Sequence, residues 1–250
     1  MSLFLKKFST HAEYNSYING SGAILPNVSI CTTEGDVHYN TSSPTPLHDY
    51  VEIGGLKWAT MNIGANSITD YGLYFQWGDT QGYTASQVGS GEGQKYFDWV
   101  TYKYGNGKSS PGATGMTKYN STDGKTVLEA SDDAARANWG GQWRMPTNDE
   151  YVALGNAVNK VWTDDYQGSG VKGLVCTDKT DSSKVLFFPA CGLCGSGSVG
   201  GVGVYGRYWS NSLYSSDVQS ACNLFFVSNS TYWDNYNNRF LGFPVRGVVG

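Results

Sequence analysis

The residues that could act as nucleophiles or general bases in this chain are few and poorly placed for catalysis. Its three histidines are His11, His38 and His48, all within or close to the first 48 residues. The rest of the chain therefore lacks an imidazole that could activate a serine or cysteine nucleophile. We interpret the three histidines as surface or turn residues, and the sequence predicts a protein that is not an enzyme.

One pair of cysteines, Cys191 and Cys194, has a spacing found in redox and zinc sites. A redox pair needs its first cysteine at a helix N-terminus, which lowers the pKa of the thiol. Here Gly-Ser-Gly-Ser-Val-Gly-Gly follows, which does not start a stable helix. A zinc site would need further ligands from Cys176 and Cys222, which lack a second Cys-x-x-Cys spacing. We expect small buried or loop cysteines, with a redox or zinc site as the alternative.

Two pairs of neighbouring aspartates could supply oxygen ligands for calcium. Asp132 and Asp133 are better explained as the negative N-terminus of a helix. Asp164 and Asp165 lie in a glycine-rich stretch and leave a calcium site open. No glycine loop followed by Lys and Ser or Thr indicates a phosphate site. No cofactor is expected apart from this open question of calcium.

The composition restricts the classes of partner. Charged residues make up 15% of the chain, whereas an average soluble protein has about 25%. The net charge of −4 comes without a basic stripe, which argues against nucleic acid. No apolar run reaches the ~18 residues of a membrane span. The first residues lack the order of a secretory signal, and five scattered cysteines indicate synthesis in a reducing cytosol.

The elements that position these residues fall into two expected parts. Residues 1–48 predict a small N-terminal helix-hairpin module, with a capping box at Thr10–Glu13, a hairpin over 28–39 and a linker over 41–46. Residues 49–250 predict one α+β domain of short strands, two helices and long Gly-rich loops. The expected strands are 51–53, 56–58, 73–77, 185–188, 224–227 and 243–246. The expected helices are 132–137 and the segment that follows the capping box Thr147–Glu150. Residues 79–125 are expected to be irregular.

Residues 207–240 have the most unusual composition. Asn, Ser, Tyr and Asp fill 19 of the 34 positions, and neither Lys nor Glu occurs. This composition is typical of antibody binding loops, in which Tyr and Trp supply rigid contact area and Ser and Asn supply adaptable hydrogen bonds. The alternatives are a polar loop without a partner and a low-complexity tract. Against the latter, apolar residues that suit core anchors recur through and just beyond the segment: Trp209, Leu213, Leu224, Phe226 and Phe243.

Several motifs, taken together, resemble a known family. They are Trp139-Gly-Gly-Gln-Trp-Arg-Met-Pro-Thr147, Tyr208-Trp-Ser-Asn-Ser-Leu213, Arg239, Gly242-Phe-Pro-Val-Arg246, Leu56-Lys-Trp-Ala-Thr-Met-Asn-Ile-Gly64 and Asp70-Tyr-Gly-Leu-Tyr-Phe-Gln-Trp-Gly78. The chain resembles the C-type-lectin-fold variable proteins of diversity-generating retroelements, in the branch related to formylglycine-generating enzymes of gut bacteria and their phages. The likeness covers about residues 50–249. The N-terminal module is similar to the leading segment of phage structural proteins.

The resemblance implies a C-type-lectin-like fold with a hypervariable region at about 207–240. In such systems, adenine-directed mutagenesis rewrites AAC codons, which never become Lys or Glu codons. Trp233 and Gln219 cannot arise in this way and are expected to be fixed or to come from other codons. The implied scaffold residues are Trp209, Ser210, Ser212, Leu213, Leu224, Phe226, Arg239, Gly242, Val245 and Arg246. The implied ligand-binding residues are Asn211, Tyr214, Asp217, Asn223, Phe225, Tyr232, Asp234, Tyr236, Asn238 and Phe240.

The resemblance further implies a receptor-binding protein or adhesin of a phage tail or cell surface, made in the bacterial cytoplasm without a signal peptide. Its ligand would be a bacterial surface protein or glycan, and the N-terminal module would attach it to the virion or surface assembly, as a homotrimer by analogy with fibre proteins. Trp233-Asp-Asn235 reverses the calcium motif of sugar-binding C-type lectins, so calcium-dependent sugar binding is not expected. The alternatives are a cysteine-dependent oxidase of the formylglycine type, for which only Cys222 lies in the relevant stretch, and a purely structural particle component.

Overall fold

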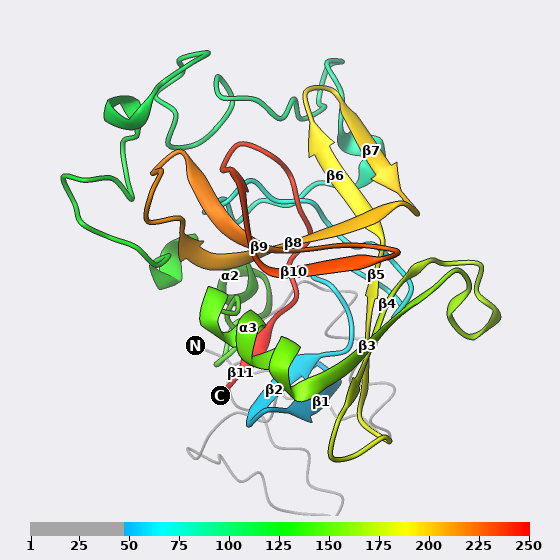
Figure 1. Ribbon diagram of the computed structural model, residues 1–250. Coiled ribbons are helices and arrows are strands. Elements are labelled where there is room, and N and C mark those ends of the chain that lie inside the picture. Colours follow the sequence, from blue (N-terminus) through cyan, green and yellow to red (C-terminus); the bar gives the residue numbers. More distant parts are fainter. Residues whose placement is uncertain (1–47) are drawn as a thin grey trace, which may run out of the picture. The chain divides into compact units, whose positions relative to one another are not determined.

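The hairpin at Gly54 and Gly55 opens the part of the chain that the structure describes. The computed structural model describes residues 48–250, so the predictions for the N-terminal module, including those for His11 and His38, lie outside the described residues. Gly54 and Gly55 have φ of 62° and 80°, which suits a two-residue turn between antiparallel strands. The strands are β1 (Tyr50–Ile53) and β2 (Leu56–Ala59). The C-terminal strand β11 (Val248–Val249) pairs with β2 and completes a three-stranded sheet (Figure 1).

Both predicted helices are confirmed. They are α2 (Ala134–Trp139) and α3 (Asn148–Ala157). The carboxylate of Asp133 caps α2 by accepting from the backbone N–H of Arg136 at 2.9 Å. The capping box begins α3 as expected: the hydroxyl of Thr147 accepts from the backbone N–H of Glu150, and the Glu150 carboxylate accepts from that of Thr147. The chain before these helices is irregular over 79–125, as predicted, with the 3₁₀ turns η1 (Ala85–Gln87) and η2 (Ala113–Gly115).

Two further sheets make up most of the regular structure. One has the antiparallel order β3-β4-β5, with β3 (Val158–Thr163), β4 (Gly173–Asp178) and β5 (Val185–Pro189). The other has the order β10-β9-β8-β6-β7, with β6 (Cys191–Gly195), β7 (Ser198–Val202), β8 (Tyr205–Leu213), β9 (Ser220–Val227) and β10 (Ser230–Asn238). Its neighbours run antiparallel except for the short parallel contact of β6 with β8. Strand β10 is therefore an edge strand of the five-stranded sheet.

The centre of the five-stranded sheet is buried on both faces. The adjacent residues Tyr208 and Trp209 of β8 are both 0% exposed but belong to different core clusters. Tyr208 packs with Phe226 and the side chains of β5, whereas Trp209 stacks on Phe243 with ring centroids 4.0 Å apart. Because aromatic side chains fill both sides, the centre of this sheet is a rigid platform, and its solvent-facing parts are the outer strands β10 and β7.

A buried arginine, Arg246, fixes the C-terminal segment. Arg246 is 0% exposed and donates to the side-chain oxygen of Asn62 and to the backbone carbonyls of Ala59, Thr60 and Phe187. Burial lowers the pKa of this guanidinium from its ordinary value. Its hydrogen bonds to carbonyl oxygens satisfy the buried donors.

Two expected strands are not strands in the structure. Of residues 73–77, only Tyr74 and Phe75 form isolated bridges, because Gly72 and Gly78, with φ of 71° and 81°, bend the chain on either side. In 243–246, Pro244 has no N–H to donate, and the final strand is β11 instead. The expected strands 185–188 and 224–227 are confirmed within β5 and β9. Residues 48–250 thus form a sheet-rich α+β structure with two α-helices and eleven strands.

Candidate ligand-binding surface

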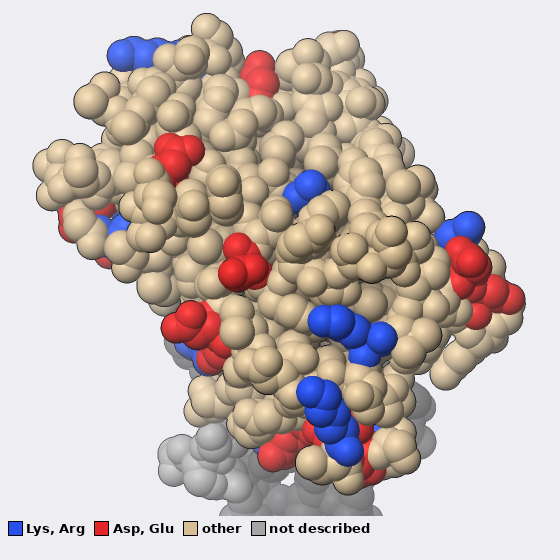
Figure 2. All heavy atoms as spheres, in the orientation of Figure 1, with Lys and Arg blue, Asp and Glu red and all other residues tan. Residues whose placement is uncertain are grey.

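Strand β10 presents alternate side chains to solvent. Tyr232, Asp234, Tyr236 and Asn238 are exposed, while the residues between them are half-buried. Tyr232 and Tyr236 remain 49% and 48% exposed, which is high for such large aromatic side chains. Figure 2 shows this side of the molecule, where uncharged residues form most of the surface over β8, β9 and β10. We define the candidate surface as the exposed side chains of β10 and those that contact them from β8 and β9.

The first part of this surface is a row of side chains across three strands. Tyr232 of β10 lies opposite Phe225 of β9, which lies opposite Arg207 of β8. The rings of Tyr232 and Phe225 stack with centroids 5.6 Å apart, and the guanidinium carbon of Arg207 lies 4.0 Å from the Phe225 centroid. Arg207 also donates to the side-chain oxygens of Asn235 and Asn237. These contacts hold the aromatic rings in fixed positions on the surface.

The second part lies toward the start of α3. The rings of Tyr214 and Tyr236 stack with centroids 3.8 Å apart and planes 4° from parallel. A hydrogen bond with Tyr214 raises the pKa of the Tyr236 hydroxyl. Beside this pair is an open cavity of about 360 Å³. It is lined by Thr126, Val127, Asn148, Asp149, Ser212, Leu213, Tyr214, Ser215, Cys222 and Asp234.

Two features bring α3 and β10 together at this point. The register of β10 against β9 shifts between Tyr232 and Asn235, so that Trp233 and Asp234 lie together opposite the single residue Leu224. The Trp233 indole packs on Gly155 of α3 so closely that a Cβ there would lie 2.5 Å from the ring nitrogen. Trp233 was expected to be fixed or to come from another codon, and this packing on Gly155 gives it a structural role.

Two of the ten expected ligand-binding residues do not face solvent, and for them the expectation is corrected. Asn223 is 0% exposed because it lies on the buried centre of β9, where its amide donates to Asn237. Asn211 is 5% exposed. The backbone N–H of Asn211 donates to the carbonyl of Pro146, and its side-chain amide donates to the carbonyl of Met145. Asn211 therefore fixes the segment that leads into α3.

Two further residues of the ten expected to bind ligand make contacts that give them a structural role. Asp217 accepts from the backbone N–H of Gln219 and the hydroxyl of Ser220, which stabilises the turn between β8 and β9. Phe240 is half-buried and packs edge-on against Trp99, with centroids 4.8 Å apart. The candidate surface therefore consists of the exposed residues Tyr232, Asp234, Tyr236 and Asn238 and of the half-buried Tyr214 and Phe225 that stack on two of them. Sequence reasoning missed Arg207, Asn235, Asn237 and Asp149; the two asparagines were missed because the polar residues of 230–238 show no alternation that would indicate a strand.

The expected scaffold residues lie where a fixed framework requires them. Apart from Ser212, which is half-buried and receives a hydrogen bond from the backbone N–H of Asn148, all are buried. Arg239 is 0% exposed and donates to the Tyr102 hydroxyl and to three backbone carbonyls. The exposed and the buried residues of this segment thus separate by position along β8 to β10.

The cysteines of the described residues do not form a common site. Cys191 and Cys194 are both 0% exposed on β6 but pack in different core clusters. Burial raises the pKa of the Cys191 thiol to about 11 and that of Cys176 to about 12. Because the thiolate is the reactive and metal-binding form, such thiols are inert at neutral pH. The expectation of small buried cysteines is confirmed for these residues.

The aspartates considered for calcium have other partners. Asp164 pairs with Lys172 at 3.1 Å and accepts from the indole of Trp162, and these contacts lower the pKa of its carboxyl. Asp165 accepts from the backbone N–H of Gly170 at 2.6 Å. Asp132 pairs with Lys103 and Lys118. Within residues 48–250, no three His, Cys, Asp or Glu side chains gather in a metal-binding cluster.

No protein-family model, curated protein or solved structure matches the chain. Neither α-helix of residues 48–250 has the length and apolar character that a membrane-spanning helix requires. We therefore treat the family resemblance of the sequence as a basis for a proposal about function.

Proposed function

We propose that this protein binds a ligand through a variable surface on β8, β9 and β10, carried by a C-type-lectin-like scaffold. On this proposal it is a receptor-binding protein or adhesin of a phage tail or cell surface, diversified by a retroelement. Its ligand is a component of a bacterial surface. The N-terminal module attaches it to the particle or assembly.

The observation that carries the proposal is the contrast between neighbouring positions. Tyr232 and Tyr236 are about half exposed on the edge strand, whereas Leu224 and Phe226 on the adjacent strand are 0% exposed. Exposed tyrosines held by stacking supply a large contact area at a low entropic cost. Binding hot spots are enriched in such aromatic residues.

The platform supports the same proposal. The exposed side chains can be replaced without disturbing the core, because the residues that pack on both faces of the sheet are at other positions. Diversification requires such a separation between framework and contact residues. The missing Lys and Glu in 207–240 agree with rewriting of AAC codons.

A genetic experiment tests the diversification directly. The DNA downstream of the gene is sequenced and searched for a near-copy of the codons for residues 207–246 beside a reverse transcriptase. We expect a copy whose mismatches fall at adenines and at the codons for the exposed residues. A complete flanking sequence without such a copy overturns the diversification and leaves binding to be tested alone.

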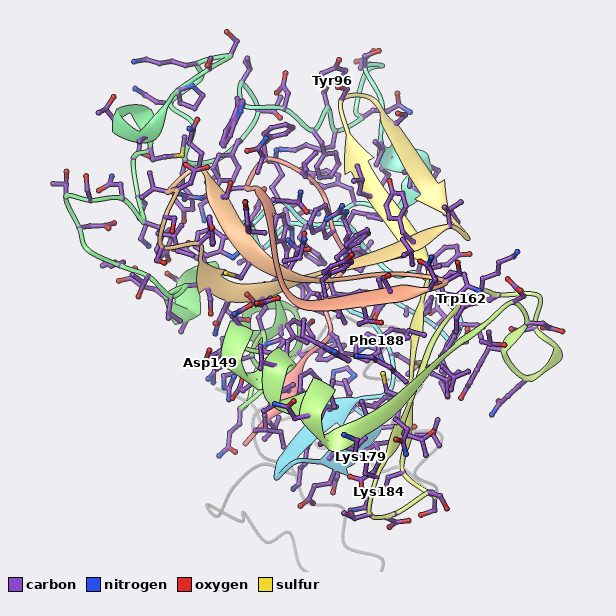
Figure 3. All side chains as sticks on the ribbon, viewed as in Figure 1. Tyr96, Asp149, Trp162, Lys179, Lys184 and Phe188 are labelled. Atoms are coloured by element: carbon purple, nitrogen blue, oxygen red, sulfur yellow. The ribbon has the colours of Figure 1, made fainter. Side chains whose placement is uncertain are left out.

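A binding experiment tests the surface. Full-length protein is applied to arrays of bacterial surface proteins and glycans, beside the variants Tyr232→Ala and Tyr236→Ala. Tyr96→Ala serves as control: Tyr96 is 37% exposed and lies beside the β6–β7 hairpin, away from β10 (Figure 3). We expect at least one ligand whose affinity falls about tenfold or more in the β10 variants and is unchanged in the control. Equal loss in all three, or no loss in any, contradicts the proposal.

The alternative of a cysteine-dependent oxidase finds less support. Such an enzyme needs paired thiols that reach the substrate in one pocket, whereas Cys191 and Cys194 lie in separate core clusters and Cys222 lines its cavity without a second cysteine among its lining residues. A structural component with an idle surface would not need the stacked, solvent-facing tyrosines of β10.

A further inference from the structure

The cavity beside Tyr214 has an unbalanced charge. Two carboxylates line it, Asp149 from the first turn of α3 and Asp234 from β10, and no Lys, Arg or His is among the lining residues. Figure 3 shows Asp149 at the start of α3, below the strands β9 and β10. Both carboxylates lie near the thiol of Cys222, whose pKa is raised to about 11 by burial and then by these two charges. The cavity therefore favours a positively charged occupant.

Among the residues that the structure describes, the two carboxylates also lack partners. Neither Asp149 nor Asp234 makes an ion pair or accepts a hydrogen bond from any residue in 48–250. Other acids of this region are paired: Glu150 binds Arg144, and Glu129 binds Lys118. The helix dipole favours a carboxylate at Asp149. No such effect acts at Asp234 on an edge strand, where a second negative charge nearby is unfavourable.

The rest of the cavity fits the stem of a long side chain. Val127, which is 45% exposed, and Leu213 and Tyr214 give it apolar walls, and three hydroxyl groups complete the lining. Asn148 also lines it, and its side-chain oxygen is buried without a donor among the described residues. Lysine and arginine combine an aliphatic stem with a cationic head that donates hydrogen bonds.

We propose that this cavity receives a lysine or arginine side chain of a protein ligand, with its cationic head between Asp149 and Asp234 and its stem along Val127, Leu213 and Tyr214. This inference rests on the proposed function, and it assigns the ligand to proteins rather than glycans. A divalent metal fits less well, because Asp149, Asp234 and Cys222 do not form a metal-binding group in residues 48–250, and the thiol of Cys222 is a poor ligand while it is protonated.

The test uses full-length protein and small probes. Nα-acetyl-lysinamide and Nα-acetyl-argininamide carry the cationic head, and Nα-acetyl-norleucinamide carries the stem alone. Binding is measured by titration with protein-observed NMR, with calcium chloride alone as a further arm. We expect at least one cationic probe to bind with a Kd on the order of 1–10 mM and the norleucine probe to bind about tenfold more weakly or not at all.

Isosteric variants connect the binding to the two carboxylates. The double variant Asp149→Asn with Asp234→Asn should weaken the binding of the cationic probes at least about tenfold, because it removes both negative charges and keeps the shape of the side chains. Glu92→Gln is the matched control, since Glu92 is exposed and outside the cavity. Thermal unfolding confirms that each variant folds.

The inference is overturned if neither cationic probe binds the native protein, or if both cationic probes bind the double variant as well as they bind the native protein. It is also overturned if calcium binds and displaces the cationic probes while the norleucine probe binds as well as the lysine probe. Failure here is distinct from failure of the proposed function. If a surface ligand is lost on Tyr232→Ala while neither cationic probe binds, the recognition surface stands and this assignment of its ligand falls.

Discussion

The guanidinium of Arg239 donates its Nε–H to the hydroxyl oxygen of Tyr102 at 2.7 Å. This contact joins the end of β10 to the long irregular excursion of residues 79–125. The same guanidinium donates to the carbonyls of Lys118, Tyr119 and Val218. One side chain thus gathers three segments that have little regular structure of their own.

Arg239→Met should therefore destabilise the protein strongly. It keeps much of the apolar stem but leaves several buried carbonyls without donors, so we expect the free energy of unfolding to fall by about 3 kcal/mol. Tyr102→Phe should lower it by about 2 kcal/mol, since two hydrogen bonds are lost, the one from Arg239 and the one that Tyr102 donates to the carbonyl of Trp77. Urea unfolding measures both. A change below about 0.5 kcal/mol for Arg239→Met would show that the network does not hold the fold.

Neighbouring positions on β9 and β10 should differ sharply in their effect on stability. Phe226 is 0% exposed, and Phe226→Ala should lower the free energy of unfolding by about 3–5 kcal/mol. Tyr232→Ala should lower it by less than about 1 kcal/mol, because the ring is half exposed and loses mainly its stacking on Phe225. Similar costs for the two variants, by denaturant titration, would contradict the separation of core from surface.

Gly155→Ala should have the opposite sign from that expected in an ordinary helix. Alanine normally stabilises a helix interior by about 1 kcal/mol over glycine. Here the added Cβ would meet the Trp233 ring at 2.5 Å, so we expect a loss of about 1–3 kcal/mol. In a Trp233→Leu background, Gly155→Ala should lower the free energy of unfolding by less than it does in the native protein. A stabilising Gly155→Ala would refute the close contact.

His48 should make stability depend on pH. Burial lowers the pKa of its imidazole to about 4, and the charge of Asp49 opposes this only in part. Its ordinary pKa is about 6.5, so between these values the unfolded chain binds more protons than the folded one. The stabilising contribution is complete above pH 6.5 and decreases as the pH falls toward 4. His48→Gln should weaken the dependence of the denaturation midpoint on pH between pH 6.5 and 5.5. An unchanged dependence on pH in this range would contradict the burial of His48.

Cys222 should react slowly with iodoacetamide at neutral pH. Burial and the charges of Asp234 and Asp149 raise the pKa of its thiol to about 11. In a Cys31→Ser background, alkylation is followed by peptide mass spectrometry as the pH rises. Asp149→Asn with Asp234→Asn should move the midpoint for Cys222 to lower pH and leave Cys176, which lies in another cluster, unchanged. Equal profiles for the two proteins would place the carboxylates away from the thiol.

Local signals in the sequence predicted some elements well. The Gly54–Gly55 turn, the capping box at Thr147 and the apolar strand 185–188 depend on nearby residues, and the structure confirms them. Strands β8 and β10 were missed because their polar residues hide the alternation, and the tertiary contacts that make them strands come from β9. The burial of Asn211 and Asn223 follows from those same contacts and could not be derived from residue type.

The irregular pairing between Tyr232 and Asn235 has a consequence for solubility. An outer strand exposes unpaired backbone groups that can join the strand of another molecule, and lysines often prevent this. No lysine follows Lys184. In β10 the bulge that interrupts the ladder, with Trp233 packed on Gly155, is a feature that hinders such pairing. Because the bulge resides in the backbone and in the contact between Trp233 and Gly155, we expect that new side chains at the exposed positions would leave this hindrance in place.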